Sequence, residues 1–512
     1  MIVGYTAAQV RAAEQPLLDA GPPGALMHQA AFGLAVRVAR LLTDRRGGVR
    51  GADVVALVGP GNNGGDALLA GAELARRGAG VTVVATSAAV HDGGLAALRA
   101  AGGTLLTVVD GGPGRRVWVG DALAEAVSAD VVVDGLLGIG ARGAVRAEAA
   151  ELVTLLAELL AQDVAPAVPD VVAVDVPSGI GVDDGDLPGP VLPADLTVTF
   201  GAVKAGLLLP PAAGLAGDVE LVDLGLDLTG STPAAARLEV SDVADLWPVP
   251  AAASHKYTRG VVGVVAGTAL YPGAAVLATT AAVLSGAGMV RYVGPAAVGH
   301  AVLAARPEVV VGHGRVQAWV AGPGVDPADA EQTGRVRDVL AEALAAGLPV
   351  VADAGALGHL PDHLSPWVVL TPHAGELATL LSVRGEEVDR ERVEVDPVLW
   401  ARRAQRVTGA TVLLKGPTTV VVGAGGAVWA QSDGPAWLAT AGSGDVLAGL
   451  LGTLLAGCAD EVLEDPPLVA ALAAAAALVH GRAAHRSNPG GPVHALGVAH
   501  ALPGTVADLL RG

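Results

Sequence analysis

The apolar residues of this chain fall in short continuous runs separated by glycine-rich turns and by longer segments with helical periodicity. We expect strands in the first half at 53–58, 81–85, 131–133, 171–174 and 196–200. In the second half we expect them at 261–266, 289–293, 319–321, 350–352, 367–370 and 411–414. Continuous apolar strands that alternate with helices are typical of parallel sheets covered by helices on both faces. The pattern therefore predicts α/β architecture in two doubly wound domains.

A break in this pattern near 229–238 divides the chain. There GSTPAAARLEV follows DLGLDL, and a fresh strand-and-helix pattern begins after Tyr257. We expect a first domain over 1–228 and a second over 239–512, with the boundary in the segment between them. The two halves carry glycine motifs that differ in kind and order, so they are not copies of one another.

Composition narrows the class of protein. The 512 residues include 51 acidic and 32 basic side chains, only 13 aromatic ones and one cysteine, Cys458. An acidic chain with no basic run and few aromatics lacks the features of a nucleic-acid binder. A single cysteine permits no internal disulfide and favours a reducing cytoplasm. We find no secretory signal pattern at the start, and the apolar run at 467–479 is too short and alanine-rich to span a membrane, so we interpret it as a buried helix.

Lysine and asparagine are scarce enough to draw attention to the places where they remain. Three of the 32 basic residues are lysines, at Lys204, Lys256 and Lys415, and the three asparagines are Asn62, Asn63 and Asn488. All three lysines, and the adjacent asparagine pair, fall inside motifs described below. Because an arginine cannot offer the compact charge of an ammonium group, these positions are candidates for specific contacts.

The strongest motif of the first half is a glycine loop that contains two asparagines. The strand DVVALV runs into GPGNNGGDA at 59–67, and an apolar helix follows to about Arg77. Gly59, Gly61 and Gly64 satisfy the dinucleotide-binding pattern GxGxxG, but no carboxylate follows at 84–86, where that fingerprint expects one. This disfavours a standard NAD oxidoreductase. Two interpretations remain: an anion-binding loop at a helix N-terminus, or a tight turn without a ligand.

Polar side chains also follow three other strands of the first half. Asp134 stands at a strand end before the glycine turn at 138–143, Asp175 stands at the next strand end before Pro177, and Lys204 follows the strand after that. Any one strand-end aspartate can be a simple turn former. Because ligands bind at the carboxyl ends of strands in open α/β sheets, we expect these residues to converge on the glycine loop.

The motifs GNNGGDA, VDGLLGIGARG and DVPSGI, with Lys204 after TVTFG, resemble the NAD(P)H-hydrate epimerase domain over about 6–228. The resemblance implies a Rossmann-like three-layer sandwich that interconverts the R and S hydrates of NADH and NADPH (NADHX and NADPHX) at C6 of the nicotinamide ring. It implies acid/base work by Asp175, a charge-steadying Lys204, and a potassium ion held by Asn63, Asp134 and Ser178. The implied substrate contacts are Asn62, Asn63, Gly64, Gly65, Asp66, Gly138, Ile139, Gly140, Ala141, Arg142, Gly143, Ala144 and Asp175. One departure is Ala67, where this family usually carries glycine.

The strongest motif of the second half is TAGSGDVLAGLL at 440–451. Gly442, Ser443 and Gly444 would aim consecutive backbone N–H groups at one anion, and Asp445 stands where a base could take a hydroxyl proton. Positioning and electrostatics of this kind are most of what phosphoryl transfer requires. A Walker A loop is excluded because no lysine is followed by Ser or Thr. The alternative is a glycine-capped buried helix with an exposed aspartate.

Further candidate residues of the second half also lie at expected strand ends. VVADAGAL sets Asp353 at one, VVLTPHAGEL offers His373 and Glu376 at the next, and the hairpin-like VLLKGPTTVVV carries Lys415. A lone histidine is more often structural than catalytic, but His373 stands beside a proline and an alanine at a strand exit, where ligands bind.

These segments, with HKYTRG, YPGAA and GPG, resemble the ribokinase-like superfamily and within it the ADP-dependent NAD(P)H-hydrate dehydratases, over about 240–510. The resemblance implies a ribokinase-like three-layer sandwich that phosphorylates the C6 hydroxyl of the S-hydrate and then loses phosphate, with Mg²⁺ bridging the phosphates of ADP. The implied substrate contacts are Ala274 or Ala275, Gly322, His373 and Asp445. The implied nucleotide contacts are Lys415, Gly416, Pro417, Thr418, Thr419 and Gly444. Departures are DAGAL for the common DADAL, which removes one carboxylate, and GSGD for GTGD.

Three interpretations of function stay open at this stage. The favoured one is a bifunctional cytoplasmic repair enzyme that acts on small molecules, with no nucleic-acid or membrane partner, and that forms a homo-oligomer of undetermined order. The preference for ADP over ATP comes from the resemblance alone. Alternatively, the second domain is a ribokinase-like small-molecule kinase, or the first domain is a non-catalytic nucleotide-binding or oligomerisation module.

Overall fold

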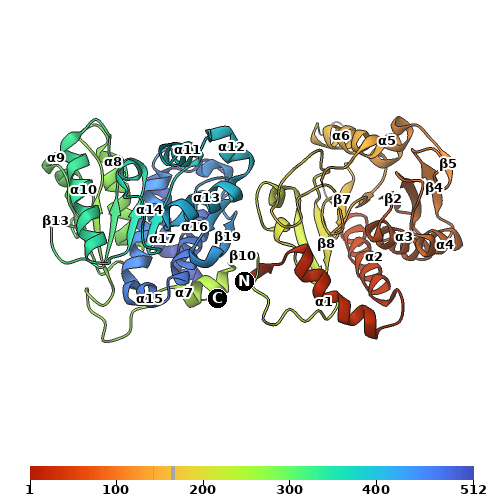
Figure 1. The fold of residues 1–512 in the computed structure, drawn as a ribbon, viewed down its shortest axis with the longest axis horizontal. Helices are drawn as coiled ribbons and strands as arrows, with labels where there is room; N and C mark the ends of the chain where they lie inside the picture. Colours follow the sequence, from red (N-terminus) through yellow and green to blue (C-terminus); the bar gives the residue numbers. More distant parts are fainter. Residues whose placement is uncertain (142, 163–167, 512) are drawn as a thin grey trace. The chain divides into compact units, whose positions relative to one another are not determined.

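The computed structural model describes residues 1–141, 143–162 and 168–511. It divides into two compact units, one of Val3–Ala235 and one of Ala236–Gly512 together with Met1–Ile2 (Figure 1). The first two residues therefore group with the second unit, although the sequence prediction placed them in the first domain. Their attachment is electrostatic in part, because the Met1 ammonium lies 2.8 Å from Glu239 Oε2 and 2.6 Å from Asp242 Oδ2.

The first unit is built on an eight-stranded sheet in the order β5-β4-β3-β2-β6-β7-β8-β9, in which neighbouring strands are parallel. The strands are β2 Asp53–Val58, β3 Gly80–Ala85, β4 Thr104–Thr107, β5 Arg115–Arg116, β6 Val131–Gly135, β7 Asp170–Val174, β8 Leu196–Phe200 and β9 Asp218–Val222. The helices are α1 Ala7–Ala20, α2 Ala25–Arg46, α3 Asn62–Arg76, α4 Asp92–Ala100, α5 Val119–Val127 and α6 Ala147–Ala161, with short 3-10 turns η1 Ala205–Leu207 and η2 Ala212–Leu215.

Helices cover both faces of this sheet, as the continuous apolar strands predict. In β2, Val54, Ala56 and Val58 pack into a core shared with α2, α3 and α4. Their neighbours Val55 and Leu57 point to the other face, into a core shared with α5 and α6. Both side-chain directions of the strand are buried, which explains why no polar residue alternates with the valines.

The strand order reverses between β2 and β6, and this reversal fixes the place of the site. The chain proceeds from β2 through β3 and β4 in one direction and from β6 through β7 and β8 in the other. The loops after β2 and β6 therefore diverge and leave a crevice at the carboxyl ends of these neighbouring strands, which is where open α/β sheets bind ligands.

The second unit is built on an eleven-stranded sheet in the order β1-β10-β19-β18-β17-β16-β15-β14-β11-β12-β13. The strands are β1 Ile2–Gly4, β10 Ala235–Arg237, β11 Val261–Val265, β12 Met289–Tyr292, β13 Val310–Val311, β14 Ala318–Ala321, β15 Val350–Ala352, β16 Val368–Leu370, β17 Thr411–Leu414, β18 Thr419–Val422 and β19 Val428–Gln431. The central strands are parallel, whereas β18 runs antiparallel to both β17 and β19. The sequence prediction of a hairpin-like element around Lys415 is thus confirmed.

Helices of the second unit also lie on both sides of their sheet (Figure 1). They are α7 Val240–Leu246, α8 Pro272–Leu284, α9 Ala296–Ala305, α10 Ala330–Ala345, α11 Ala374–Val383, α12 Arg390–Val395, α13 Pro397–Thr408, α14 Ser443–Gly457, α15 Ala459–Glu464, α16 Pro467–Ser487 and α17 Ala495–Leu509, with 3-10 turns η3 Ala354–His359, η4 Ala424–Gly426 and η5 Ala436–Leu438. One large core joins α8, α14, α16 and α17 to the sheet. The α/β class with two doubly wound sandwiches, predicted from the sequence, is confirmed.

Helix α16 contains the longest apolar run of the sequence. It is long and apolar enough to cross a membrane by length and composition, but 78% of its apolar window is buried inside the second unit. Its buried residues include Leu472, Leu478 and Val479, which belong to the core with α14 and α17. The interpretation of this run as a buried helix is confirmed.

Candidate functional sites

The glycine loop of the first unit has no room for side chains at two of its positions. A Cβ atom on Gly59 would lie 1.9 Å from the Leu136 carbonyl oxygen, and one on Gly64 would lie 2.3 Å from the Gly59 carbonyl oxygen. Gly61 caps α3 in an extended conformation with open space beside it. The loop after β2 therefore packs backbone against backbone on the loop after β6, and this packing brings the first turn of α3 to the crevice.

Asn63, in the first turn of α3, links three strand ends. Its buried Nδ2 donates to the Leu137 carbonyl oxygen (2.9 Å) and to the Val174 carbonyl oxygen (2.8 Å). Its amide oxygen lies beside Gly138, where an added Cβ would be 2.8 Å from Oδ1. The amide NH₂ is thus used structurally, and the amide oxygen faces the glycine turn after β6.

Asp134 is fully buried at the end of β6 and is bound by Ser178. Its Oδ2 accepts from the Ser178 backbone N–H (2.8 Å), and its Oδ1 accepts from Ser178 Oγ (2.6 Å) and from the Leu136 N–H (3.3 Å). Burial raises the pKa of the Asp134 carboxyl, and the bonds from Ser178 and Leu136 only partly oppose that rise. The structure thus places Asn63, Asp134 and Ser178 around the same strand ends.

Asp175 and Lys204 form a buried ion pair. Lys204 Nζ donates to Asp175 Oδ1, and it also donates to Thr199 Oγ1 (3.2 Å) and to the Phe200 carbonyl oxygen (2.7 Å). The lysine side chain is 1% exposed. Asp175 has a φ of +66°, a left-handed conformation that is uncommon outside glycine and that marks functional sites more often than ordinary turns.

Asn63, Asp175 and Lys204 line a cavity of about 770 Å³ at the crevice, whereas Asp134 and Ser178 are not among its lining residues. Of the residues predicted to contact substrate, those that line it are Asn62, Asn63, Asp66, Gly138, Ile139, Gly140, Ala141 and Asp175, and Lys204 joins them. Gly64 and Gly65 lie in the first turn of α3, and Gly143 has a φ of +77° in the turn before Ala144; none of these four is among the lining residues. Arg142 lies outside the described residues.

Sequence reasoning missed the contribution of α1 to this cavity. Arg11, Glu14 and Gln15 of α1 line the cavity together with the residues that follow β2, β6 and β7. Burial raises the pKa of the Glu14 carboxyl, Lys204 lowers it and Asp175 raises it. No motif marks these residues, because they reach the site by packing of a helix that lies some 50 residues before the glycine loop. The only feature of the sequence that could have indicated this contribution is a glutamate that follows two alanines on α1.

In the second unit, Asp445 lies in the first turn of α14, after Gly442, whose backbone is in the left-handed conformation. Gly442 caps the helix with a φ of +86°, and a Cβ there would meet Leu277 Cδ1 at 2.5 Å. Burial raises the pKa of Asp445 to about 7; repulsion from Asp353 adds to the rise, and Lys415 opposes it. A carboxyl with a pKa near neutrality can both take up and release a proton under physiological conditions.

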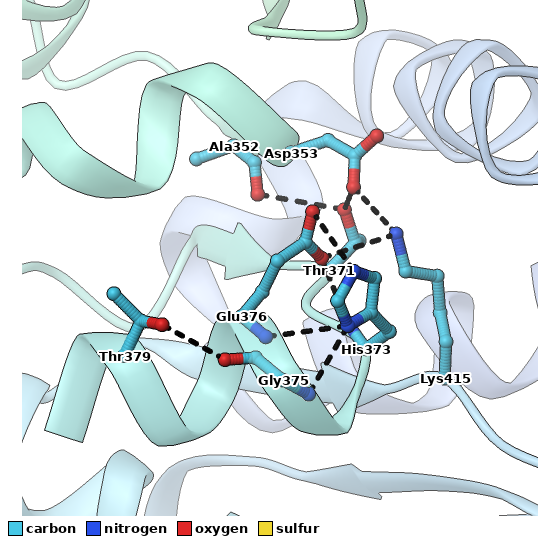
Figure 2. Close-up of polar contacts among 8 residues, drawn as sticks. All are labelled: Ala352, Asp353, Thr371, His373, Gly375, Glu376, Thr379 and Lys415. Carbon is cyan, nitrogen blue, oxygen red and sulfur yellow. Dashed lines mark hydrogen bonds and ion pairs between the residues drawn. The ribbon is translucent and has the colours of Figure 1, made fainter. Parts of the chain in front are cut away.

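Lys415, at the end of β17, connects the strand ends around Asp445. Figure 2 shows its Nζ between two carboxylates, 2.8 Å from Asp353 Oδ1 and 3.8 Å from Glu376 Oε2. Asp353 is buried and also accepts from Thr371 Oγ1 (2.9 Å). Burial alone would lower the pKa of Lys415, but Asp353, Glu376 and Asp445 outweigh it and raise the pKa. The lysine is therefore held charged at the edge of the sheet.

His373 caps α11 through its side chain. Its Nδ1 accepts from the backbone N–H groups of Gly375 (3.1 Å) and Glu376 (3.2 Å) (Figure 2). In return, Glu376 Oε2 accepts from the backbone N–H of His373 (2.8 Å). Because Nδ1 is an acceptor, a neutral His373 carries its proton on Nε2, which lies 3.6 Å from Glu376 Oε1. His373 thus presents an N–H donor at the site and cannot act as a base through Nε2 in this state.

The other residues predicted for this site lie in the turns after β14 and β17 and at the starts of α8, α14 and β18. Gly322, after β14, has a φ of +105°, and a Cβ there would lie 1.9 Å from the Asp353 carbonyl oxygen. A Cβ on Gly324 would lie 2.3 Å from the Ala274 Cβ, so the start of α8 packs on the turn after β14. A Cβ on Gly444 would lie 3.3 Å from Lys415 Nζ. Gly416 and Pro417 are exposed in the turn between β17 and β18, followed by Thr418 and the first residue of β18, Thr419.

Sequence reasoning missed His480, which lies under the N-terminus of α14. This buried histidine of α16 bonds to the Ser443 backbone. Burial lowers its pKa to about 4, and Lys415 adds to the lowering, so His480 is neutral near pH 7. His480 is one of two histidines in this alanine-rich helix, and nothing in the sequence indicates which of them reaches the glycine turn.

The folds and sites define a two-domain α/β enzyme, in which each unit carries acidic residues at the carboxyl ends of its strands. Residues 262–491 match the family model described as NAD(P)H-hydrate dehydratase, and residues 24–206 match that of the YjeF-related protein N-terminus. The chain belongs to the family of bifunctional NAD(P)H-hydrate repair enzymes.

Individual relatives match either most of the chain or one of its halves. The chain is 45% identical over 469 residues to the bifunctional NAD(P)H-hydrate repair enzyme Nnr of Mycobacterium tuberculosis, which covers 88% of this chain and 89% of the relative. It is 48% identical over 239 residues to the NAD(P)H-hydrate epimerase of Clavibacter michiganensis, covering 45% of this chain and 94% of the relative. A solved structure of the Bacillus subtilis ADP/ATP-dependent NAD(P)H-hydrate dehydratase, 26% identical, covers 53% of this chain and 97% of its own with a TM-score of 0.46.

Proposed function

We propose that the first unit epimerises the R and S hydrates of NADH and NADPH at C6 and that the second unit dehydrates the S-hydrate with ADP, releasing AMP and phosphate. The observation that carries this proposal is that one chain, aligned along most of its length with bifunctional repair enzymes, holds both a cavity that Asp66, Asp175 and Lys204 line and a lysine–carboxylate cluster beside Asp445. The two activities complement each other, since the epimerase supplies the only epimer that the dehydratase uses.

In the dehydration, Asp445 takes the proton of the C6 hydroxyl while that oxygen attacks the terminal phosphorus of ADP. AMP leaves, and the backbone N–H groups at the start of α14 face the transferring group. Phosphate then departs from C6 and a proton from C5, which restores the C5–C6 double bond. Lys415 is placed to bind the nucleotide phosphates, and His373 to donate from Nε2 to the substrate.

A magnesium ion fits this site only when the nucleotide brings it. Within residues 1–141, 143–162 and 168–511, no group of three or more His, Cys, Asp or Glu side chains could hold a metal ion. Asp353 is already bound to Lys415 and Thr371. Mg²⁺ commonly binds through substrate phosphates and water with one or two carboxylates, and it would neutralise phosphate charge in this way. Asp445 and Asp353 would supply those carboxylates to the magnesium ion, Asp353 in addition to its bonds to Lys415 and Thr371.

In the epimerisation, the ion pair of Asp175 and Lys204 fixes one carboxylate at the wall of the cavity. Asp175 is placed to accept a proton from a group at C6, and Lys204 holds that carboxylate in position through its bonds to Thr199 and Phe200. The first turn of α3 supplies amide donors for the substrate, as expected of a helix N-terminus that meets an anion.

The donor set of Asn63, Asp134 and Ser178 fits a potassium ion. A fully buried carboxylate, an amide oxygen and a hydroxyl are the hard oxygen ligands that such a cation prefers. Among the described residues, the hydrogen-bond donors of Asp134 are Ser178 and Leu136, and neither is cationic. A bound K⁺ would supply the missing positive charge and hold the loops after β6 and β7 together.

The remaining expectations stand as parts of the same proposal. We propose that 1–228 and 239–512 fold as separate domains, that the enzyme uses ADP in preference to ATP, and that it works in the cytoplasm as a homo-oligomer. Limited proteolysis with mass spectrometry tests the boundary, competition between the two nucleotides tests the donor, and light scattering tests the oligomer.

One assay tests the whole proposal. Purified full-length protein is given a mixture of R and S hydrates with ADP and Mg²⁺, and recovery of absorbance at the dihydronicotinamide wavelength is followed to completion. Full recovery with AMP and phosphate supports both activities. Recovery of only the S fraction, after subtraction of spontaneous epimerisation, removes the epimerase, and a stable phosphorylated product would instead identify a kinase.

A further inference from the structure

The cavity of the first unit contains three carboxyl groups and one lysine. Asp66 of α3, Glu14 of α1, Asp175 after β7 and Lys204 before η1 all line it. Asp66 is influenced electrostatically by each of the other three, and Glu14 by Asp175 and Lys204. The four groups therefore act on one another across a single pocket of about 770 Å³.

All three N–H donors of Lys204 are used by groups other than Asp66. An ammonium group has three donors, and Lys204 directs them to Asp175, Thr199 and the Phe200 carbonyl. Thr199 Oγ1 (3.3 Å) and the Phe200 N–H (3.2 Å) also donate to Asp175 Oδ1. The Asp175 carboxyl thus has three hydrogen-bond donors, which are Lys204 Nζ, Thr199 Oγ1 and the Phe200 N–H.

Within the part of the chain that the structure describes, Asp66 lacks the hydrogen-bond donors that surround Asp175. Its side chain is buried, and its Oδ1 has no hydrogen-bond partner among the described residues. Burial raises the pKa of Asp66 well above its ordinary value, Asp175 and Glu14 raise it further, and only Lys204 opposes them. The other titratable neighbours do not compensate: Arg11 NH2 donates to the Ile139 carbonyl oxygen, and His91, which packs on Gly65, accepts from the Gly94 N–H (3.0 Å).

We infer that Asp66 is the proton donor of the epimerase and that Glu14 is a positioning residue whose negative charge keeps Asp66 protonated. This inference rests on the epimerisation proposed above. It assigns opposite roles to two carboxyls of one pocket: Asp175 accepts hydrogen bonds from Lys204, Thr199 and Phe200, whereas Asp66 is buried beside other carboxyls and its Oδ1 has no partner among the described residues. Two carboxyls in such different environments can supply the acid and the base of one site.

The corresponding step balances without a further reactant. Asp66 gives its proton to the C6 hydroxyl, the C6–O bond breaks, and water leaves with the bonding electrons while the N1 lone pair forms a C6–N1 double bond. Water then adds to the opposite face of C6, and Asp175 takes the proton that this water loses. The reverse conversion, or proton exchange with solvent, returns the proton to Asp66.

The test uses the full-length protein, whose second unit reports on folding. Conversion of pure R-hydrate, coupled to ADP-dependent dehydration, measures the epimerase, and pure S-hydrate measures the dehydratase alone. Asp66→Asn is expected to lower R-hydrate conversion by about 100-fold or more, as for loss of a general acid, with S-hydrate dehydration retained. Wild-type conversion in this variant would overturn the assignment. If the wild-type protein itself converts no R-hydrate, the proposed epimerase activity has failed, independently of the roles given to these carboxyls.

Glu14→Gln provides a readout that a purely structural role would not move. Removing the Glu14 charge lets Asp66 lose its proton more readily, so the alkaline limb of the R-hydrate pH profile is expected to shift to lower pH. The matched control is Asp19→Asn, which removes an exposed carboxylate from the same helix outside the cavity and should leave the limb in place. A limb that stays in place in Glu14→Gln, or that moves equally in Asp19→Asn, would refute the role of Glu14.

Discussion

Lys415 Nζ lies 2.8 Å from Asp353 Oδ1 although the two residues are 62 positions apart in the chain. Asp353 follows β15 and Lys415 follows β17, so the parallel strands around β16 bring them to one edge. Asp353 also raises the pKa of Asp445 and Lys415 lowers it, so both residues of the pair influence the expected base.

Lys415→Arg is expected to lower ADP-dependent dehydration by about 100-fold, the usual loss when a preorganised charge at a transferring group is displaced. The guanidinium is larger and planar, and it does not fit between Asp353 and Gly444, whose Cβ position is 3.3 Å from Lys415 Nζ. Steady-state dehydration of S-hydrate measures the effect, with epimerisation of R-hydrate as the folding control. Unaltered dehydration would show that any cation serves at this position.

Dehydration is expected to fall as the pH decreases through about 7, because Asp445 must be ionised to accept the hydroxyl proton and its pKa is raised to about 7. Asp445→Asn should abolish the activity. Asp353→Asn should shift the acid limb to lower pH, since it removes a neighbouring negative charge that raises the pKa of Asp445. A pH–rate profile of each variant checks this, and an acid limb that moves to higher pH would contradict the electrostatic explanation.

Lys204→Met is expected to destabilise the first unit by about 3 kcal/mol or more, because it leaves the Asp175 carboxylate buried without its cation. Hydrogen exchange of β7 and β8 in the full-length protein measures this local loss. Lys256→Met, at an exposed lysine, is the matched control and should change little. Equal protection of β7 in both variants would mean that the ion pair contributes nothing to stability.

Gly64→Ala is expected to disrupt the glycine loop, whereas Gly61→Ala is expected to be mild. The new Cβ of Gly64→Ala would lie 2.3 Å from the Gly59 carbonyl oxygen, but that of Gly61→Ala meets no atom within 4 Å. Replacing the N-cap glycine costs only a few tenths to about 1 kcal/mol. Epimerisation rates and thermal unfolding of the two variants give the comparison, and similar losses in both would point to flexibility of the loop, not to close packing.

Potassium is expected to raise the thermal midpoint of the first unit, because a ligand that binds only the folded state stabilises it. The effect should disappear in Asp134→Asn, which removes the buried charge that the cation would neutralise. Unfolding in KCl and in tetramethylammonium chloride of equal ionic strength separates site binding from general salt effects. Equal midpoints in both salts would remove potassium from the proposal.

The sequence by itself determined the architecture of the protein and the positions of most polar residues at its strand ends. All eleven expected strands exist to within one residue or two at each end, because runs such as 53–58 bury both faces of a parallel sheet and leave an unambiguous pattern. The glycine loop, Asp175 and Asp445 were found in the same way, since the carboxyl ends of parallel strands meet at one edge whatever the details of packing.

Only the tertiary structure decided which of these groups act on one another. Glu14 and His480 carry no local motif, and they reach their sites because α1 and α16 pack there. The ionisation of Asp66 and Asp445 likewise depends on burial and on the distances to Lys204, Lys415 and other charges, which are properties of the folded chain. Periodicity and turn chemistry are local and can be recognised in a sequence, whereas desolvation and Coulomb energy arise between residues that only folding brings together.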